Sequence, residues 1–302
     1  MTQVLKAIYS LPYREHLSFK GGTSLSKCWG LIERFSEDAD LGIDREYLGF
    51  EGELSKTQIS DKLRRAACAF VRERMQHDLH DQLIRNGLSE DLLNVSVDIT
   101  PVTTTDPEVI RVAYRSVYPE LNDPYLPPVV KIEVSGRSMS EPIADKVICS
   151  LVDNAYPQSA VAEEKFEVRA VLPERTFLEK VFLLHEEFSK PHVRVERMSR
   201  HIYDIAMMMQ GIHTNALADE NLYRQVLEHR RQFIGLKGFN YDTLYSDSIT
   251  IVPTGEVRDL WRKDYEQMQE HMIWGESTPT YDNLLEILQL LNEQLRGLGY
   301  RK

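Results

Sequence analysis

The sequence has few cysteines, no long apolar run and no excess of positive charge. Its three cysteines, Cys28, Cys68 and Cys149, are odd in number and far apart. Neither a disulfide framework nor a zinc site is therefore expected. No stretch reaches the length of a membrane span, and residues 1–16 contain no apolar signal core. These absences predict a cytoplasmic protein without a membrane partner.

Acidic residues outnumber basic ones. The chain of 302 residues carries 36 lysines and arginines against 47 aspartates and glutamates, a formal net charge of −11. A protein whose whole surface serves nucleic acid is normally basic, so any such contact must use local patches. With 42% hydrophobic and 27% charged residues, the chain can form one large domain or two modest ones, and disorder is not expected.

Residues 19–43, FKGGTSLSKCWGLIERFSEDADLGI, hold the main chemical motif. Gly21 and Gly22 allow a tight turn and leave room for a ligand to approach the backbone amides. Thr23 or Ser24 is expected to cap a helix, whose start favours phosphate oxygens. The apolar positions expected on this helix are Leu25, Cys28, Trp29 and Ile32. The pattern predicts a phosphate-binding turn.

A pair of aspartates follows this helix. Asp38 and Asp40 would share one face of a strand while Ala39 and Leu41 take the other. Adjacent carboxylates repel, and a hard cation such as Mg²⁺ or Mn²⁺ between them and a phosphate usually compensates. Each motif alone is more often structural, a turn or a solvated strand end. Together, in the order strand, glycine turn, helix, aspartate strand, they predict a site for a metal-bound triphosphate.

The combination resembles a known superfamily. GGTS followed by SEDAD resembles the signature of DNA polymerase beta-like nucleotidyltransferases. The fuller strings KGGTSLSK and LIERFSEDADL resemble the AbiEii/AbiGii-type toxin family, and the likeness extends to the MenT/MenA group of tRNA-modifying toxins. The resemblance implies an α+β fold. A polymerase-beta-like lobe at 1–171 would have a mixed, strongly twisted sheet flanked by helices, and 172–302 would be a mainly helical lobe.

A third carboxylate is expected from a later strand. Residues 92–134 alternate apolar and polar side chains, as half-buried strands do. The expected strands are 93–100, 109–117 and 129–134, with a further short strand at 166–171. Two-metal chemistry commonly needs an acid from a neighbouring strand. Glu133 and Asp98 both alternate correctly, and Glu133 is preferred because VVKIEVSGRS resembles the family's third carboxylate position. Arg137 could reach a phosphate or form a salt bridge.

Two segments are locally basic. A helix expected at 54–79 carries Lys56, Lys62, Arg64, Arg65, Arg72 and Arg74. Its charges fit a nucleic-acid backbone and equally a solvated helix face. A second cluster comprises Lys190, Arg194, Arg197 and Arg200, with His192 and His201 among them. Contact with the phosphates of an acceptor is the functional interpretation of both clusters, and a solvated helix face stays the alternative for the first.

Lys180 lies in a predicted helix that begins near Pro173. It falls off the apolar stripe of Phe177, Val181, Leu184 and Phe188. A surface lysine paired with Glu179 or Glu187 is one interpretation. The string RTFLEK also resembles the family's second motif, which implies that Lys180 neutralises triphosphate charge, as phosphoryl transfer requires.

Asp204 has two interpretations as well. It could form a salt bridge with Arg200 within one helix. The string SRHIYD, however, resembles the family's later motif, which implies that Asp204 is catalytic and accepts or orients the proton of the attacking hydroxyl. Asp38, Asp40 and Glu133 are then expected to converge, with Lys180 and Asp204 facing them across a cleft between the lobes.

The resemblance implies a metal-dependent nucleotidyltransferase that acts as a toxin. It would move a nucleoside monophosphate from a nucleoside triphosphate (NTP) to RNA, at the 3′ end of tRNA, block aminoacylation, and have an antitoxin partner. The triphosphate ligands would be Gly21, Gly22, Thr23, Ser24 and Lys180. The expected phosphate contacts of the acceptor are Arg137, Arg194, Arg197, Arg200, His201, Lys62 and Arg65. The alternatives are a protein hydroxyl as acceptor, and a non-catalytic module that binds nucleotide or docks an antitoxin.

Overall fold

The computed structural model describes residues 1–36, 38–98, 106–119, 125–139, 141–160, 162–245, 247–275 and 278–300. The chain forms two compact units. Unit 1 comprises Met1–Gly30 and Ser36–Val171, and unit 2 comprises Leu31–Phe35 and Leu172–Lys302. The short segment Leu31–Phe35 thus belongs to the unit formed by the second half of the chain, although its neighbours in sequence belong to the first.

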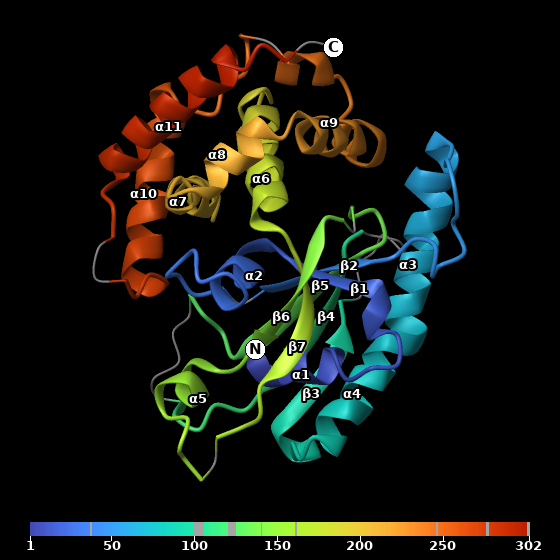
Figure 1. Ribbon diagram of the computed structural model, residues 1–302. Coiled ribbons are helices and arrows are strands. Elements are labelled where there is room, and N and C mark those ends of the chain that lie inside the picture. The colour runs from blue at the N-terminus through green and yellow to red at the C-terminus, as the bar shows by residue number, and fades with distance from the viewer. Residues whose placement is uncertain are drawn as a thin grey trace. The chain divides into compact units, whose positions relative to one another are not determined.

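Unit 1 contains the strands (Figure 1). They are β1 (Leu17–Lys20), β2 (Asp38–Ile43), β3 (Leu93–Val97), β4 (Glu108–Tyr114), β5 (Val129–Ser135), β6 (Ile143–Ile148) and β7 (Phe166–Val171). Its α-helices are α1 (Thr2–Ile8), α2 (Gly21–Lys27), α3 (Arg64–Phe70), α4 (Gln76–Arg85) and α5 (Leu151–Ala155). Stretches of π-helix at Gln58–Leu63 and Val71–Met75 make 58–85 one continuous helical segment.

The strands of the described residues form one mixed sheet of seven, in the order β3-β4-β5-β2-β1-β7-β6. β2 pairs in parallel with β5, β1 pairs in parallel with β7, and the remaining pairs are antiparallel. The predicted α+β class with a mixed sheet is therefore confirmed. The predicted strands at 109–117 and 129–134 correspond to β4 and β5, whereas residues 99–100 of the first predicted strand lie outside the described residues.

One face of the sheet is apolar. In β5, Val130, Ile132 and Val134 are buried, and they join a core with side chains of α1, α3 and α4. Lys131 and Glu133 lie on the opposite face because successive side chains of a strand alternate. The burial of apolar side chains on one face thus leaves a charged face on the other.

The first glycine helix differs from the prediction in two ways. α2 begins at Gly21 with Lys20 as N-cap, and no side chain caps it. The Thr23 hydroxyl instead donates to the carbonyl oxygen of Asp38, so the predicted Thr23 or Ser24 cap is wrong. The helix also ends at Lys27. Gly30 then takes a positive φ of 62°, which ends the helical path before Ile32.

Unit 2 is helical in the described residues (Figure 1). Its α-helices are α6 (Pro173–Phe188), α7 (Ser199–Met208), α8 (Ile212–Ala218), α9 (Glu220–His229), α10 (Gly255–His271) and α11 (Tyr281–Gly297). α6 buries Phe177, Val181 and Leu184, as its apolar spacing predicts, and it packs against α7, α8 and α9. No helix among the described residues is long and apolar enough to cross a membrane.

Candidate active site

Two carboxylates of the predicted metal site are direct neighbours. In the parallel pairing of β2 with β5, Asp40 lies opposite Glu133 and Asp38 lies opposite Lys131. Residues that lie directly opposite each other in paired strands have their side chains on the same face. These four side chains therefore lie on the charged face of the sheet. The register therefore brings Asp38, Asp40 and Glu133 together at adjacent positions.

Gly21 lies against the carboxylate row, as we call Asp38, Asp40 and Glu133. Its φ is +75°, and a Cβ added there would lie 1.9 Å from Asp40 Oδ2. A side chain would thus be strained by the backbone and would also collide with the carboxylate. The glycine turn keeps the backbone at the start of α2 close to Asp40, as the prediction of a phosphate-binding turn beside the carboxylates requires.

Lys20 lies next to the carboxylate row, although no sequence motif had indicated it. It lies opposite Asp40 in the antiparallel pairing of β1 with β2 and is partly exposed. Its position immediately before the glycine pair could have identified it, because a cation there lies beside both the turn and the aspartates. Carboxylates therefore have basic neighbours on both sides, Lys20 from β1 and Lys131 from β5.

The side chains do not form a preformed metal cage. Among the described residues, no group of three or more histidine, cysteine, aspartate or glutamate side chains is placed to hold a metal ion. Carboxylates repel without a cation between them, and Asp38 Oδ1 instead lies 3.9 Å from Lys131 Nζ. The donor set still fits a hard divalent cation in chemistry, since carboxylate oxygens of two neighbouring strands meet along one row.

The two candidates for the third carboxylate, Asp98 and Glu133, lie at different distances from β2 in the sheet. Asp98 follows β3, and its backbone amide donates to Val109 of β4 at 3.1 Å. Strands β4 and β5 lie between β3 and β2 in the sheet, whereas Glu133 is in the strand next to β2. Asp98 is also ion-paired with Arg111. These positions favour Glu133.

Arg137 takes the structural one of its two predicted roles. Its guanidinium forms an ion pair with the buried carboxylate of Asp106 and donates to the Asp106 carbonyl oxygen at 3.1 Å. A guanidinium that binds a buried residue at two points stabilises the fold, and breaking this pair would leave the Asp106 carboxylate as a buried charge without its cation. The structure thus does not favour the predicted phosphate contact.

In unit 2, Lys180 and Asp204 meet. Lys180 of α6 is only 8% exposed, and its Nζ lies 3.0 Å from Oδ2 of the fully buried Asp204 of α7. Neither a surface pair of Lys180 with Glu179 or Glu187 nor an Arg200–Asp204 salt bridge describes this arrangement. The two residues that the family resemblance selected are in direct contact.

Arg34 completes this cluster, although no sequence motif had indicated it. Its guanidinium is 2% exposed and binds Asp204 through two bonds, Nε to Oδ1 at 2.7 Å and Nη2 to Oδ2 at 2.8 Å. Burial alone would raise the pKa of Asp204, but the charges of Arg34 and Lys180 lower it well below its ordinary value. Asp204 is thus a buried anion held between two cations.

The backbone of Leu31–Phe35 holds Arg34 in place. The amide of Phe35 donates to Met272 O at 2.6 Å, and the amide of Trp274 donates to Glu33 O at 3.1 Å. The amide of Glu33 donates to the Tyr203 hydroxyl at 3.3 Å. These contacts bind the segment to α7 and to the end of α10, all within unit 2.

His201 lies beside Lys180. Its Nδ1 is 3.5 Å from Lys180 Nζ. Burial is the largest cause of a pKa well below the ordinary value for His201, and the charges of Lys180 and Arg200 lower it further. The imidazole is therefore neutral at pH 7, and as a phosphate contact it would act as a hydrogen-bonding group without charge.

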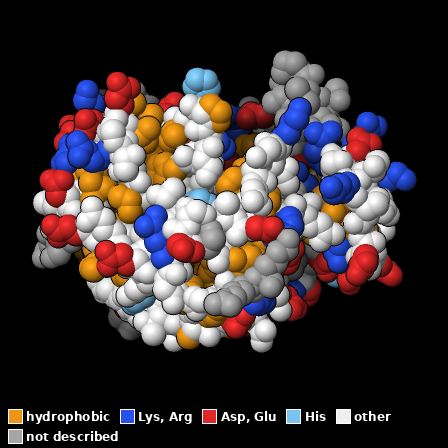
Figure 2. Space-filling model, turned by 90° about the horizontal axis from the view of Figure 1, so that it is seen from above, with side chains coloured by type: hydrophobic (Ala, Val, Ile, Leu, Met, Phe, Trp, Pro, Cys, Tyr) orange, Lys and Arg blue, Asp and Glu red, His pale blue; other side chains and the backbone are white. Residues whose placement is uncertain are grey.

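The second basic cluster is partly neutralised by buried acids. Lys190 Nζ and Arg194 Nη2 both bind Oε2 of the buried Glu187, at 2.6 and 2.7 Å. The amide of Arg197, whose φ is +58°, donates to Asp264 Oδ1 at 2.6 Å. On the face shown in Figure 2, basic and acidic side chains are interspersed. The pairing favours a structural role for Lys190 and Arg194.

The first basic helix is also partly neutralised, by the partly exposed Asp61 and the buried Glu108. Arg65 Nε lies 2.8 Å from Asp61 Oδ1, and Arg72 Nη2 lies 3.0 Å from Oε2 of the buried Glu108. Lys62 is exposed. A solvated helix face with local ion pairs describes this segment better than a continuous track for nucleic acid.

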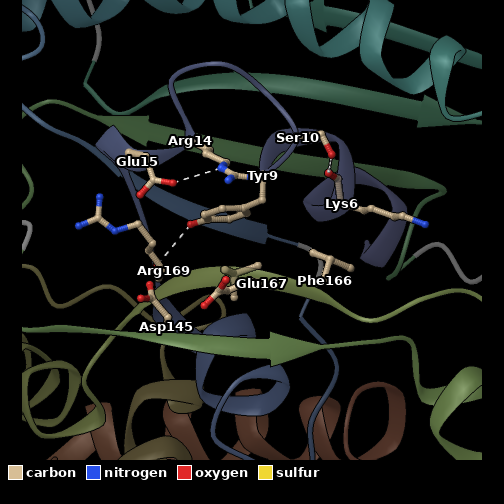
Figure 3. A pocket seen from close by; sticks show the side chains of 10 residues that line it. Lys6, Tyr9, Ser10, Arg14, Glu15, Asp145, Phe166, Glu167 and Arg169 are labelled. Carbon is tan, nitrogen blue, oxygen red and sulfur yellow. Dashed lines mark hydrogen bonds and ion pairs between the residues drawn. The ribbon is translucent and has the colours of Figure 1, made fainter.

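A separate cavity of about 200 Å³ lies on the β6–β7 side of unit 1. Figure 3 shows Lys6, Arg14 and Arg169 around it together with Glu15 and Asp145. Within it the Tyr9 hydroxyl donates to Arg169 O at 3.3 Å. Because cations and carboxylates are mixed here, the lining selects no single ligand charge, and this cavity does not compete with the carboxylate row as the candidate site.

Paired strands that carry Asp38, Asp40 and Glu133 beside the Gly21 turn are typical of nucleotidyltransferases of the DNA polymerase beta-like class. A protein-family profile described as nucleotidyl transferase AbiEii toxin, type IV TA system, matches residues 3–287. The chain therefore belongs to the AbiEii family and is a nucleotidyltransferase toxin. Membership brings an NTP substrate and a cognate antitoxin.

Solved structures also match the chain, and one of them is a bacterial toxin. MenT4, a nucleotidyltransferase toxin from Mycobacterium tuberculosis H37Rv, superimposes with a TM-score of 0.44 and 17% sequence identity, over 100% of this chain and 91% of that chain. No curated protein matches the chain significantly.

Proposed function

We propose that this toxin transfers a nucleoside monophosphate from an NTP to the 3′ end of tRNA, in a reaction that needs Mg²⁺ or Mn²⁺. The observation that carries the proposal is the pairing of Asp40 with Glu133 beside the Gly21 turn. Metal-bound triphosphates need carboxylate oxygens next to backbone that phosphates can approach closely. This part of unit 1 supplies both.

Each residue of the carboxylate row has a task in this scheme. Asp38, Asp40 and Glu133 would hold the cation, which supplies charge neutralisation at the phosphates and at the attacking and leaving oxygens. Gly21, Gly22, Thr23 and Ser24 at the start of α2 would receive the triphosphate, because helix N-termini favour anions. Lys20 would add a positive charge on the same side.

We assign Lys180 to the phosphates and Asp204 to positioning Lys180. A good proton acceptor has a pKa near the working pH. Asp204 is fully buried, and Arg34 and Lys180 hold its pKa far below that range. A carboxylate in these surroundings is a weak base but a strong anchor, so it fixes the direction of the Lys180 ammonium. That Lys180 faces the carboxylates of unit 1 stays a prediction.

Modification of the tRNA 3′ end would block aminoacylation and stop translation. The substrate places the reaction in the cytoplasm, which agrees with three cysteines that are all free. A growth-arresting product explains why a cell that encodes the protein needs the antitoxin of its family.

Incubation with total tRNA and each of the four α-labelled NTPs tests the proposal. We expect label on RNA that needs the divalent cation, and mass analysis of tRNA 3′ ends then identifies the nucleotide. Asp40→Asn should abolish the label, and the exposed Asp247→Asn should retain it.

Three results would contradict the proposal. Label on protein that survives ribonuclease would make a protein hydroxyl the acceptor. Nucleotide binding without pyrophosphate release would indicate a non-catalytic module. Equal labelling by Asp40→Asn and wild type would remove the carboxylate row from the reaction.

A further inference from the structure

The charged face of the sheet extends beyond the carboxylates. Lys131 of β5 lies opposite Asp38, and Arg111 of β4 lies opposite Lys131. The three residues therefore form one row across three neighbouring strands, on the face away from the apolar core. Strands are about 4.8 Å apart, so Arg111 lies about 10 Å from the backbone of Asp38.

The two cations of this row are accessible. The side chain of Arg111 is 41% exposed, and that of Lys131 is 26% exposed. A guanidinium can bind a phosphate through two hydrogen bonds, and an ammonium adds a compact charge next to it. Neither residue belongs to the basic segments that the sequence pointed to.

The geometry of in-line displacement indicates which of the two substrates, triphosphate or acceptor, lies next to Lys131 and Arg111. The attacking and leaving oxygens lie on opposite sides of the phosphorus. The Gly21 turn and Lys20 are on the β1 side of Asp40, so the triphosphate and its leaving pyrophosphate belong there. The attacking hydroxyl then approaches from the opposite side, over β5 and β4.

We propose that Lys131 and Arg111 form a binding site for backbone phosphates of the acceptor strand, just upstream of its attacking 3′ hydroxyl. The inference rests on the proposed function, and it identifies a phosphodiester chain as the acceptor. It also explains how a protein with a net charge of −11 can hold RNA with a small local patch.

Asp98 restrains this site. Its carboxylate forms an ion pair with Arg111 through the Arg111 Nε. Both side chains are partly exposed, at 41% for Arg111 and 35% for Asp98. A phosphate must therefore replace Asp98 as the partner of Arg111. Removal of the Asp98 charge should strengthen acceptor binding, whereas removal of the Arg111 charge should weaken it.

Steady-state rates at varied tRNA and varied NTP test the site. We expect Arg111→Gln and Lys131→Gln to raise the KM for tRNA about tenfold each, since a charged contact contributes roughly that much. Arg111 lies one strand further from Asp38 than Lys131 does, so Arg111→Gln should change the KM for NTP less than twofold. Asp98→Asn should lower the KM for tRNA. Each lost phosphate contact should reduce the slope of log kcat/KM against log salt by about one.

Arg85→Gln is the matched control. Arg85 is exposed on α4, which packs on the opposite, apolar face of the sheet, so its KM for tRNA should equal that of wild type. Arg111→Lys keeps a charge and should recover part of the affinity. Thermal unfolding of all variants separates lost binding from lost folding.

The outcomes distinguish this inference from the proposed function. Wild type that labels no RNA overturns the function itself. Wild type that labels RNA, with an unchanged KM for tRNA in folded Arg111→Gln and Lys131→Gln, overturns only the phosphate site. A rise in the KM for NTP without a rise in the KM for tRNA would place these residues at the triphosphate and overturn it as well.

Discussion

Asp40 occupies the space that a side chain at Gly21 would need. An added Cβ would lie 1.9 Å from Asp40 Oδ2, at a backbone φ of +75°. The Asp40 carboxylate, which we propose holds the cation, and the Gly21 turn, which we propose receives the phosphates, are therefore packed directly against each other. A larger residue at Gly21 cannot be accepted without displacing Asp40.

Gly21→Ala should therefore abolish most nucleotide transfer. We expect a loss of at least tenfold in kcat/KM, together with about 1–2 kcal/mol of stability from the strained backbone. Gly30→Ala is the control, because Gly30 also has a positive φ, +62°, but no atom lies within 4 Å of its added Cβ. Equal activity of the two variants in the labelling assay would contradict the role given to this contact.

Asp204→Asn should destabilise the protein by about 3–5 kcal/mol, the cost of leaving buried charges without their partner. Arg34 and Lys180 would both lose the carboxylate that neutralises them. Urea unfolding measures the change, with the exposed Asp247→Asn as control. A loss below 1 kcal/mol would show that water reaches these cations.

Stability should decrease on acidification below about pH 6.5, the ordinary pKa of histidine. Burial is the first cause that lowers the pKa of both His201 and His185 in the folded state. The unfolded chain consequently binds more protons in this range, which favours unfolding as the pH falls. Asp204 does not contribute to this decrease near pH 6. Because its pKa is lowered in the folded state, its contribution to stability is lost only as the pH falls through and below the ordinary carboxyl range.

Urea midpoints between pH 7.5 and 5 check this prediction. His201→Gln should flatten the decline, and His185 should account for the remaining slope. His77→Gln is the control, because His77 is exposed on α4. A midpoint of wild type that stays constant over this range would contradict it.

Asp264→Ala should cost about 2 kcal/mol, since a charged helix cap contributes that much. One carboxylate oxygen accepts from the Arg197 amide, and the other accepts from the amide and the hydroxyl of Ser199, at 2.9 and 2.5 Å. Ser199 begins α7, the helix of Asp204. Thermal unfolding measures the loss, and Asp259→Ala, exposed on the same helix α10, should change little.

Local patterns could predict the sheet and its carboxylates. The period of two in 129–134 placed Glu133 on the polar face of β5, and the same alternation placed Asp38 and Asp40 on one face of β2. Strand periodicity is a local property, so the face on which a side chain lies can be predicted without knowing the partner strand. The resemblance to the family predicted in addition that these carboxylates converge, whereas the register that places Asp40 opposite Glu133 came from the structure.

Contacts between distant segments could not be predicted in this way. Arg34 and Asp204 are 170 positions apart, and neither helical spacing nor charge patterning connects them. Trp29 and Ile32 fit the helical spacing of apolar residues, but the helix ends at Lys27. The positive φ of Gly30 is incompatible with a continuing helix, whatever the spacing of the apolar residues. Ion pairs within the basic segments likewise depended on the buried partners Glu108 and Glu187.

The segment Leu31–Phe35 has a consequence for dissecting the protein. Since it belongs to unit 2 while the residues on both sides belong to unit 1, a cut between Val171 and Leu172 would not release two independent pieces. The first fragment would still carry Arg34 and the backbone amides that bind the second. We expect a protein nicked at this peptide bond to copurify as a noncovalent pair, and the isolated fragment 172–302 to require the segment 31–35 for its own stability.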